Sequence, residues 1–335
     1  MKTLLSVLSL IISISAFSQQ TLNIFIITTD GFRWKEVFFG ADSLIINDPR
    51  FVKDIALSKE LFWEEKMEER RKKLMPFFWN TVARSGQLYG NRQLKNRVNN
   101  KNLYRISYPG YNEIFTGYAD PFVIKNSPVN NKNINILEYL NALPAYNGKV
   151  VAFTSWDIFP FIFNKKRNSL NINSSYILTG SDDSSTIINK VQNSIINKTG
   201  TRHDLLTFVS AKDYIQSNHP RVVMISLGET DEFAHQGRYD LYLQQANSVD
   251  RMIAELWYFV QTDSFYKDQT TFIITTDHGR GARHTNWTTH NMIAKGSGDA
   301  WLALLGNGIE PLGEMRSAEK LYLNQVAATV AALLG

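Results

Sequence analysis

Three carboxylates of the sequence, Asp30, Asp231 and Asp277, each follow an apolar, β-branched segment. Two of them have a histidine close by, because His278 adjoins Asp277 and His235 follows Asp231 by four residues. Residues four apart share one face of a helix, so Asp231 and His235 can bind the same cation. A single carboxylate at the end of a strand is more often a turn or helix cap than a ligand. Three of them together with two histidines instead indicate a site for metal ions.

The segment TTDHGRGARHTNWTTHN, residues 275–291, is the richest in metal-binding side chains. It contains two further histidines, His284 and His290. We favour His290 as a ligand because the longer loop before it can fold back to the Asp277-His278 pair. The chain has no cysteine, so oxygen and imidazole nitrogen must supply the ligands. This donor set suits zinc, with manganese or iron as alternatives.

A hydroxyl group that could act as the nucleophile lies in the segment RISYPGYNEIFTGYAD, residues 105–120. Pro109 suits the first turn of a helix, which places Ser107 at the helix N-terminus. Free backbone N–H groups and the positive end of the helix dipole make this position suitable for an anion. A neighbouring metal ion would hold the serine as an alkoxide near neutral pH. The alternative interpretation is that Ser107 only caps the helix.

The elements that must position these side chains follow from the hydrophobic pattern. Four continuous apolar segments predict buried parallel strands, and two charged stretches with spaced apolar residues predict helices. Alternating strands and helices predict an α/β fold around a mostly parallel sheet, with ligands beyond the carboxyl ends of the strands. The predicted strands are residues 22–29, 150–155, 222–227 and 271–276, and the predicted helices are residues 59–83, which Pro76 ends or kinks, and 239–260.

The first 18 residues predict a secretory signal peptide. Lys2 precedes an apolar stretch up to Phe17, and small residues stand before Gln19. The stretch is shorter than the roughly 20 apolar residues that a membrane span requires. We therefore expect an exported protein, periplasmic or secreted, without a membrane anchor after cleavage. The mature chain, residues 19–335, is predicted to form a single catalytic domain with a cap-like insertion around residues 164–201, which are rich in Asn and Ser.

The composition excludes several classes of protein. With 335 residues, 44% of them hydrophobic and 12% aromatic, the chain is too apolar to be disordered. The absence of cysteine excludes disulfide scaffolds, Cys-ligated metal sites and thiol nucleophiles. A net charge of +5 without a block of Lys or Arg gives no reason to expect nucleic acid scaffold binding. The sequence predicts no particular oligomeric state.

The order of the motifs resembles the alkaline phosphatase superfamily, and is most similar to its type I phosphodiesterase and nucleotide pyrophosphatase branch. The resemblance covers about residues 22–313. It implies a three-layer α/β sandwich with a mostly parallel central sheet, two zinc ions, and a covalent phosphoryl or sulfuryl enzyme intermediate. The motifs are TTDGFRW with Asp30, SYPGYNEIFTG with Ser107, TDEFAHQG with Asp231 and His235, TDHGRG with Asp277 and His278, and WTTHN with His290.

The resemblance also implies roles for individual residues. Ser107 would attack phosphorus, and Asn126 would bind a nonbridging oxygen of the substrate, although three further asparagines lie close by in the sequence. Two metals a few ångströms apart would stabilise the attacking and leaving oxygens. One metal site would consist of Asp30, Ser107, Asp277 and His278, and the other of Asp231, His235 and His290; the competing asparagines are Asn130, Asn131 and Asn133.

Two departures from the family pattern affect the expected activity. The diesterase branch usually has threonine at the position of Ser107, and formylglycine sulfatases have arginine at the position of Tyr111. We expect an exported, metal-dependent hydrolase of phosphate esters, with phosphodiester or pyrophosphate bonds favoured and a small phosphate ester or nucleotide as substrate. The alternatives are a phosphomonoesterase or sulfatase of the same superfamily, and a noncatalytic secreted protein that binds a phosphorylated or sulfated ligand through its metals.

Overall fold

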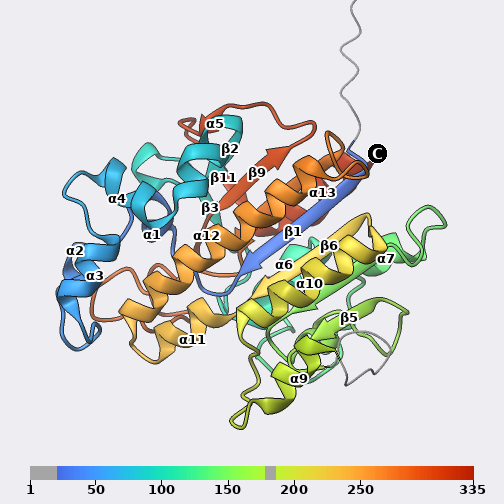
Figure 1. Ribbon diagram of the computed structural model, residues 1–335, viewed down its shortest axis with the longest axis horizontal. Coiled ribbons are helices and arrows are strands. Elements are labelled where there is room, and N and C mark those ends of the chain that lie inside the picture. The colour runs from blue at the N-terminus through green and yellow to red at the C-terminus, as the bar shows by residue number, and fades with distance from the viewer. Residues whose placement is uncertain (1–20, 178–185) are drawn as a thin grey trace, which may run out of the picture.

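The computed structural model describes residues 21–177 and 186–335 (Figure 1). The predicted signal peptide, residues 1–18, lies outside the described residues. Within the described ranges, no helix combines the length and the apolar character that crossing a bilayer requires.

A large mixed sheet forms the centre of the molecule. Its strand order is β10-β2-β9-β7-β1-β6-β4-β5, in which the five strands from β7 to β5 are parallel and β9 is antiparallel to both of its neighbours. All four predicted strands are confirmed as members of the parallel part. The strands are β1 Asn23–Thr29, β2 Gly86–Tyr89, β4 Val150–Thr154, β5 Asn171–Ser174, β6 Val222–Leu227, β7 Thr270–Thr276, β9 Leu302–Gly306 and β10 Gly313–Glu314.

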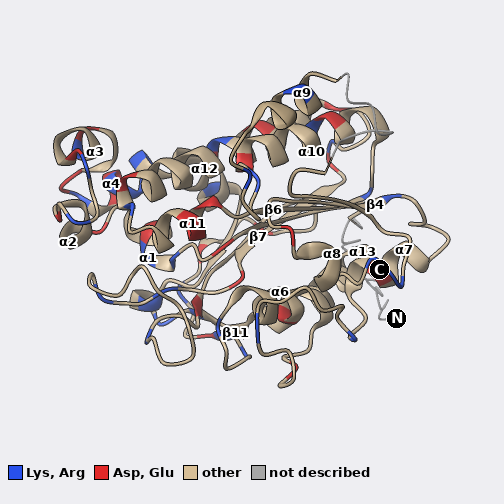
Figure 2. Ribbon diagram, turned by 90° about the horizontal axis from the view of Figure 1, so that it is seen from below, with Lys and Arg blue, Asp and Glu red and all other residues tan. Residues whose placement is uncertain are grey.

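The middle of strand β1 consists of consecutive apolar residues because both faces of the sheet are covered. Phe25 and Ile27 lie in the hydrophobic core on one face, and Ile24 and Ile26 lie in the core on the other. Successive side chains of a strand point to opposite faces, so a strand that is buried on both sides cannot alternate with polar residues. In Figure 2, α9 to α12 cover one face of the sheet, and α6, α7, α8 and α13 cover the other. The predicted three-layer α/β architecture is confirmed.

The helices differ from prediction in one place. Helix α12 begins at the predicted residue, and the predicted interruption at Pro76 is confirmed, because α4 ends at Leu74 and a π-helical turn follows at Phe78–Val82. A continuous helix before Pro76 is wrong, because α3 ends at Phe62. The residue before a proline is disfavoured in the helical conformation, which explains the end of α4. The helices are α1 Trp34–Phe39, α2 Ser43–Ile46, α3 Ile55–Phe62, α4 Met67–Leu74, α5 Ala83–Ser85, α6 Ser107–Thr116, α7 Ile136–Ala142, α8 Phe159–Ile162, α9 Ile187–Ser194, α10 Asp204–Asn218, α11 Glu229–His235, α12 Tyr239–Thr262 and α13 Val326–Leu334.

A small sheet of three strands lies beside the central sheet. Its order is β11-β3-β8, with β3 Arg97–Asn99, β8 Asp299–Ala300 and β11 Lys320–Tyr322. Strand β3 precedes α6, which begins at Ser107, and β8 and β11 follow the Asp277-His278 pair. The small sheet therefore joins these two parts of the chain.

The stretch at residues 164–201 contains two elements in its described part. Strand β5 pairs with β4 at the edge of the central sheet, and helix α9 follows it. Residues 178–185 of this stretch lie outside the described residues. A function of this stretch as a cap stays a prediction.

Candidate metal centre

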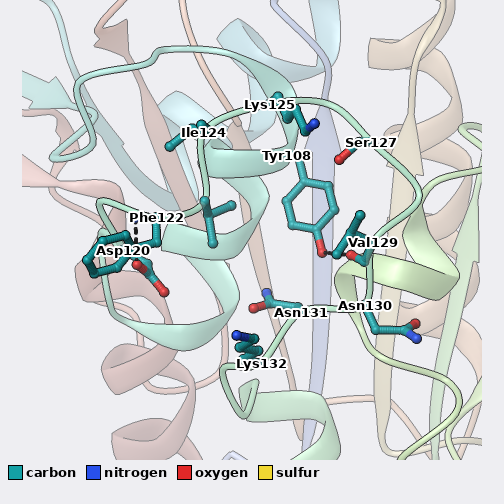
Figure 3. Close-up of a pocket in the computed structure, with 11 residues that line it drawn as sticks. Tyr108, Asp120, Phe122, Ile124, Lys125, Ser127, Val129, Asn130, Asn131 and Lys132 are labelled. Carbon is teal, nitrogen blue, oxygen red and sulfur yellow. Dashed lines mark hydrogen bonds between the residues drawn. The ribbon is translucent and has the colours of Figure 1, made fainter.

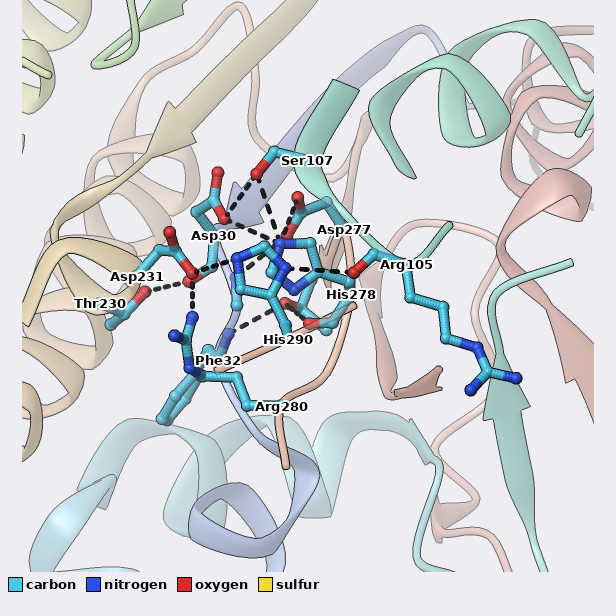
Figure 4. Close-up of polar contacts among 12 residues, drawn as sticks. Asp30, Phe32, Arg105, Ser107, Thr230, Asp231, Asp277, His278, Arg280 and His290 are labelled. Atoms are coloured by element: carbon cyan, nitrogen blue, oxygen red, sulfur yellow. Dashed lines mark hydrogen bonds and ion pairs between the residues drawn. The ribbon is translucent and has the colours of Figure 1, made fainter. Parts of the chain in front are cut away.

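The predicted ligands meet at the carboxyl ends of the central strands (Figure 4). Asp30 follows β1, and Asp277 and His278 follow β7. Asp231 lies in α11, which begins two residues after β6. Because β1 lies between β6 and β7, all three strands deliver their last residues to one place, although these residues are far apart in sequence. Ser107 faces this place from the first turn of α6.

One group of donors surrounds the hydroxyl of Ser107. Its Oγ lies 3.4 Å from Oδ1 of Asp30 and 3.3 Å from Nε2 of His278. The same Nε2 atom lies 3.4 Å from Oδ1 of Asp30 and 3.4 Å from Oδ2 of Asp277. These are the four residues predicted for the first metal site. Asp30, Asp277 and His278 are buried, and their donor atoms are close enough to share one ion.

A second group lies beside the first. Nε2 of His235 is 3.0 Å from Oδ2 of Asp231 and 3.0 Å from Nε2 of His290. Asp231 and His290 also form a possible ion-binding set with His278, which therefore lies between the two groups. The rings of His278 and His290 stack with their centroids 3.9 Å apart. The structure brings His290 into the cluster and places His284 near Asp48 instead.

Backbone carbonyls fix the orientation of two histidines. Nδ1 of His278 lies 2.9 Å from the carbonyl oxygen of Gly279, and Nδ1 of His290 lies 3.1 Å from that of Arg105. A carbonyl only accepts, so each Nδ1 carries the proton and each Nε2 presents its lone pair to the cluster. Burial and the nearby His278 lower the pKa of His290 to about 2, which keeps it neutral and able to bind a metal.

The two carboxylates of the first group are buried close to other acids. Burial and the neighbouring Asp231 raise the pKa of Asp30 well above its usual range. Burial and the neighbouring Asp30 do the same to the pKa of Asp277. Oδ2 of Asp277 is buried and accepts no hydrogen bond. Two buried acids that lie close together, with one carboxylate oxygen of Asp277 unpartnered, fit the binding of a divalent cation, which would stabilise their ionised forms.

Arg280 places a buried positive charge beside the second donor group. Its side chain is buried, and Nη1 donates to Oδ1 of Asp231. Nε donates to the carbonyl of Trp287 at 2.9 Å, and Nη2 donates to the carbonyl of Thr288 at 2.5 Å. Burial opposes ionisation of Asp231, but the guanidinium outweighs it and lowers the pKa of Asp231 well below its usual range. Arg280 therefore joins α11 to the loop that contains His290.

Asn126 lies at the N-terminus of α6, next to Ser107. Its Oδ1 accepts a hydrogen bond from the backbone N–H of Tyr108 at 2.8 Å. Two of the competing asparagines are engaged elsewhere, because Asn131 and Asn133 both donate to Oδ1 of Asn112. A role of Asn126 in binding substrate stays a prediction.

A pocket of about 280 Å³ lies between α6 and the loop that contains Asn126 (Figure 3). Its lining is mostly apolar, and the hydroxyl of Tyr108 donates across it to the carbonyl of Val129 at 2.7 Å. Lys125 and Lys132 supply positive charge at this pocket.

Two side chains that the sequence did not single out fix the backbone of the site. Oγ1 of Thr230 donates to the carbonyl of Asp30 at 2.6 Å, and Nδ2 of Asn100 donates to the carbonyl of Asp277 at 2.7 Å. The position of Thr230 next to Asp231 is a weak local signal. Nothing in the sequence near Asn100 connects it with a residue 177 positions later.

A third such residue, Asp204, holds the turn before α11. It accepts hydrogen bonds from the backbone N–H groups of Gly228 and Glu229 and from the side chains of Ser155 and Gln245. The turn that leads to Asp231 is thereby fixed from inside the protein.

A family model matches the C-terminal part of the sequence. Residues 181–335 match the model of the Metalloenzyme superfamily. The matched segment contains five of the predicted ligands and ends with the chain; the five are Asp231, His235, Asp277, His278 and His290. Among curated proteins, no sequence match is found.

Solved structures show where else this fold occurs. A protein in the alkaline phosphatase superfamily from Vibrio parahaemolyticus is 12% identical with a TM-score of 0.54, covering 95% of this chain and 67% of its own. The phosphonate monoester hydrolase of Agrobacterium radiobacter is 11% identical with a TM-score of 0.57, and the match covers 93% of this chain and 73% of the hydrolase chain. A mutant of the alkaline phosphatase PafA is 11% identical with a TM-score of 0.58, and the match covers 94% of this chain and 96% of the phosphatase chain. The chain thus has the fold of alkaline phosphatase superfamily structures.

Proposed function

We propose that the protein is an exported, metal-dependent hydrolase of phosphate esters, with phosphodiester or pyrophosphate bonds favoured. The observation that carries the proposal is the position of Ser107. Its hydroxyl lies within 3.4 Å of Asp30 and His278, at the N-terminus of a helix and beside a cluster of carboxylates and imidazoles. This is the environment that activates a serine for attack on a phosphate ester.

Two divalent ions, which we propose to be zinc, fit the two donor groups. Asp30, Ser107, Asp277 and His278 would hold one ion, and Asp231, His235 and His290 the other. Bound there, the ions would lower the pKa of the serine hydroxyl and neutralise charge on the phosphoryl oxygens.

The proposed reaction has two displacements at phosphorus. Oγ of Ser107 forms a bond to phosphorus as the bond to the ester oxygen breaks, and the leaving alcohol or phosphate takes up a proton. Water then attacks the phosphoserine, which releases the phosphate product and returns the hydroxyl of Ser107. The positive end of the α6 dipole favours the anion that forms at this point. Asn126, which lies at the same helix end, would bind a nonbridging oxygen through its Nδ2 group.

The fold supports this class of reaction, since it is shared with an alkaline phosphatase and a phosphonate monoester hydrolase. A formylglycine sulfatase is less compatible with the site. Tyr111 stands where that pattern has arginine, and its hydroxyl is buried, 3.3 Å from Oδ2 of Asp30 and 3.1 Å from Oγ of Ser226. A small phosphate ester or nucleotide is the proposed substrate.

A substrate panel tests the proposal. Zinc-loaded protein is assayed with bis-p-nitrophenyl phosphate, p-nitrophenyl phosphate and p-nitrophenyl sulfate, beside Ser107→Ala and the exposed control Ser194→Ala. We expect the diester to be cleaved fastest, Ser107→Ala to lose at least about a thousandfold in kcat, and the control to keep wild-type activity. Absence of metal-dependent turnover, or equal turnover by Ser107→Ala, would contradict the proposal. A noncatalytic binding protein would instead retain its affinity for phosphate in Ser107→Ala.

Export is tested separately, by expressing the full chain in a bacterium and determining the N-terminus of the protein recovered outside the cytoplasm. We expect it to begin near Gln19. A chain that keeps residues 1–18 in the cytoplasm would contradict export without affecting the proposed chemistry.

A further inference from the structure

A second pocket, distinct from the donor cluster, lies at the edge of the small three-stranded sheet. Its volume is about 460 Å³. It is bounded by that sheet, by the loop before α6 and by the loop before β8. Four basic side chains and one acidic side chain, Asp299, line it; the basic ones are Lys101, Arg105, Lys295 and Lys320.

In the part of the chain that the structure describes, the positive charge of this pocket is only partly offset by Asp299, which interacts with Arg105 and Lys295. Asp299 forms its ion pair with Arg92, which lies outside the lining, at 3.0 Å. Among the described residues, no carboxylate lies within ion-pair distance of any of the four basic side chains. The pocket therefore holds an excess of positive charge.

Two of these charges converge on one aromatic ring. Nζ of Lys101 lies 4.8 Å from the centroid of Tyr322, and Nζ of Lys320 lies 5.2 Å from it. The ring attracts each ammonium group. Because both lysines line the pocket, an anion bound there would gain from both charges.

The backbone that forms the pocket is held in place before any ligand arrives. Glu113, buried in α6, accepts hydrogen bonds from the backbone N–H groups of Lys101 and Asn102 at 2.6 and 2.8 Å. Asn102 in turn accepts from the N–H of Arg105 at 2.9 Å. Arg105 has a φ of 55°, a conformation that is uncommon for a residue other than glycine. Such a rigid loop can bind a ligand with little loss of conformational entropy.

The conformation of Arg105 connects the pocket with the donor cluster. Its carbonyl faces His290, while its guanidinium extends away from Ser107 (Figure 4). Asn100, which also lines the pocket, donates to the carbonyl of Asp277. The pocket and the cluster thus share two segments of backbone, but their side chains point into different spaces.

We infer that this pocket binds a second phosphate or sulfate group, separate from the one that reacts at Ser107. The group comes either from a remote position on the substrate or from a free inorganic anion. Binding of the anion does not depend on the proposed hydrolase function; only the link to the substrate rests on it.

The first experiment measures binding alone. Isothermal titration calorimetry with inorganic pyrophosphate is performed on the mature chain, residues 19–335, kept metal-free with EDTA. The pocket variant is Lys101→Gln/Lys320→Gln, and the control is Lys165→Gln/Lys166→Gln, which removes the same charge from two exposed lysines outside the pocket. We expect the pocket variant to bind about three- to tenfold more weakly than wild type and the control to be unchanged. No detectable binding by wild type, or equal weakening in both variants, would overturn the inference.

The second experiment identifies the source of the anion. The zinc-loaded proteins are assayed with the p-nitrophenyl ester of thymidine 5′-phosphate, with and without a 3′-phosphate. A loss of preference for the 3′-phosphorylated ester in the pocket variant alone supports a remote group of the substrate. An unchanged preference together with weaker pyrophosphate binding supports a free anion. If wild type hydrolyses neither ester, the proposed function fails, while the calorimetry still decides whether the pocket binds anions.

Discussion

The Nδ1 atom of His290 lies 3.1 Å from the carbonyl oxygen of Arg105, two residues before Ser107. This contact joins the loop after β7 to the segment that contains Ser107. It also directs Nε2 of His290 toward Asp231 and His235. The position of one imidazole therefore depends on the backbone next to the hydroxyl of Ser107.

His290→Ala should remove one of two bound zinc ions and lower kcat/KM by at least about a hundredfold, because the second donor group loses a neutral imidazole. Metal content by mass spectrometry and turnover of bis-p-nitrophenyl phosphate measure the two effects. His284→Ala is the matched control, since His284 lies outside the cluster. Equal metal content in His290→Ala and wild type would contradict the assignment of His290.

Arg280→Met should destabilise the metal-free protein more than the zinc-bound protein. Without the guanidinium, the largely buried Asp231 keeps only histidine neighbours, which costs about 2–4 kcal/mol when no metal is present. Bound zinc would replace this positive charge and reduce the cost. Urea unfolding of both proteins with zinc and with EDTA measures the difference. Arg280→Lys serves as the conservative control and should recover part of the loss in EDTA. The same loss with zinc and with EDTA would mean that Arg280 acts only through its contacts with the backbone.

Chelation should lower the thermal stability of the protein. The proposed zinc site exists only where Asp30, Asp231 and Asp277 converge in the folded protein, so zinc should stabilise the folded state by about 2.7 kcal/mol at a hundredfold excess over its Kd. Scanning calorimetry with zinc and with EDTA should show a higher Tm with zinc, and Asp277→Asn should reduce this shift. An identical Tm under both conditions would argue against a metal centre.

Asp250 predicts a pH dependence of stability that is independent of the metal centre. Its carboxylate accepts from the N–H groups of Phe77 and Phe78, at 2.7 and 2.9 Å, where the chain enters the π-helical turn. Burial raises the pKa of Asp250 from its ordinary range to about 7. The contribution of this group to stability is therefore fully present below pH 4 and is lost as the pH rises through 7.

Relative to Asp250→Asn, which does not titrate, wild type should lose on the order of 2–3 kcal/mol of unfolding free energy between pH 5 and pH 8. Urea unfolding at both pH values measures this change. Asp213→Asn, at a residue on helix α10, provides the control, and its difference from wild type should not vary over this range in the same way. A constant difference between wild type and Asp250→Asn would show that burial does not raise this pKa.

The sequence predicted the strands well because β1, β4, β6 and β7 are buried on both faces and read as continuous apolar runs. It predicted the part of residues 59–83 before Pro76 poorly. Charged residues with interspersed apolar ones fit a single helix there, but Trp63 to Lys66 leave the helical conformation between α3 and α4. That break depends on packing with the rest of the molecule, which a local pattern does not contain.

The chemistry of the centre follows from the sequence alone. The types of side chain, the absence of cysteine and the position of each carboxylate after a strand already restrict the site to oxygen and imidazole ligands at one edge of a sheet. Only the tertiary structure decided which groups meet there. It placed His278 between both donor groups, brought His290 rather than His284 into the cluster, and paired Arg280 with Asp231. These outcomes depend on distances between segments that are tens to hundreds of residues apart, and such distances are fixed by how strands pair and loops fold, not by the spacing of residues along the chain.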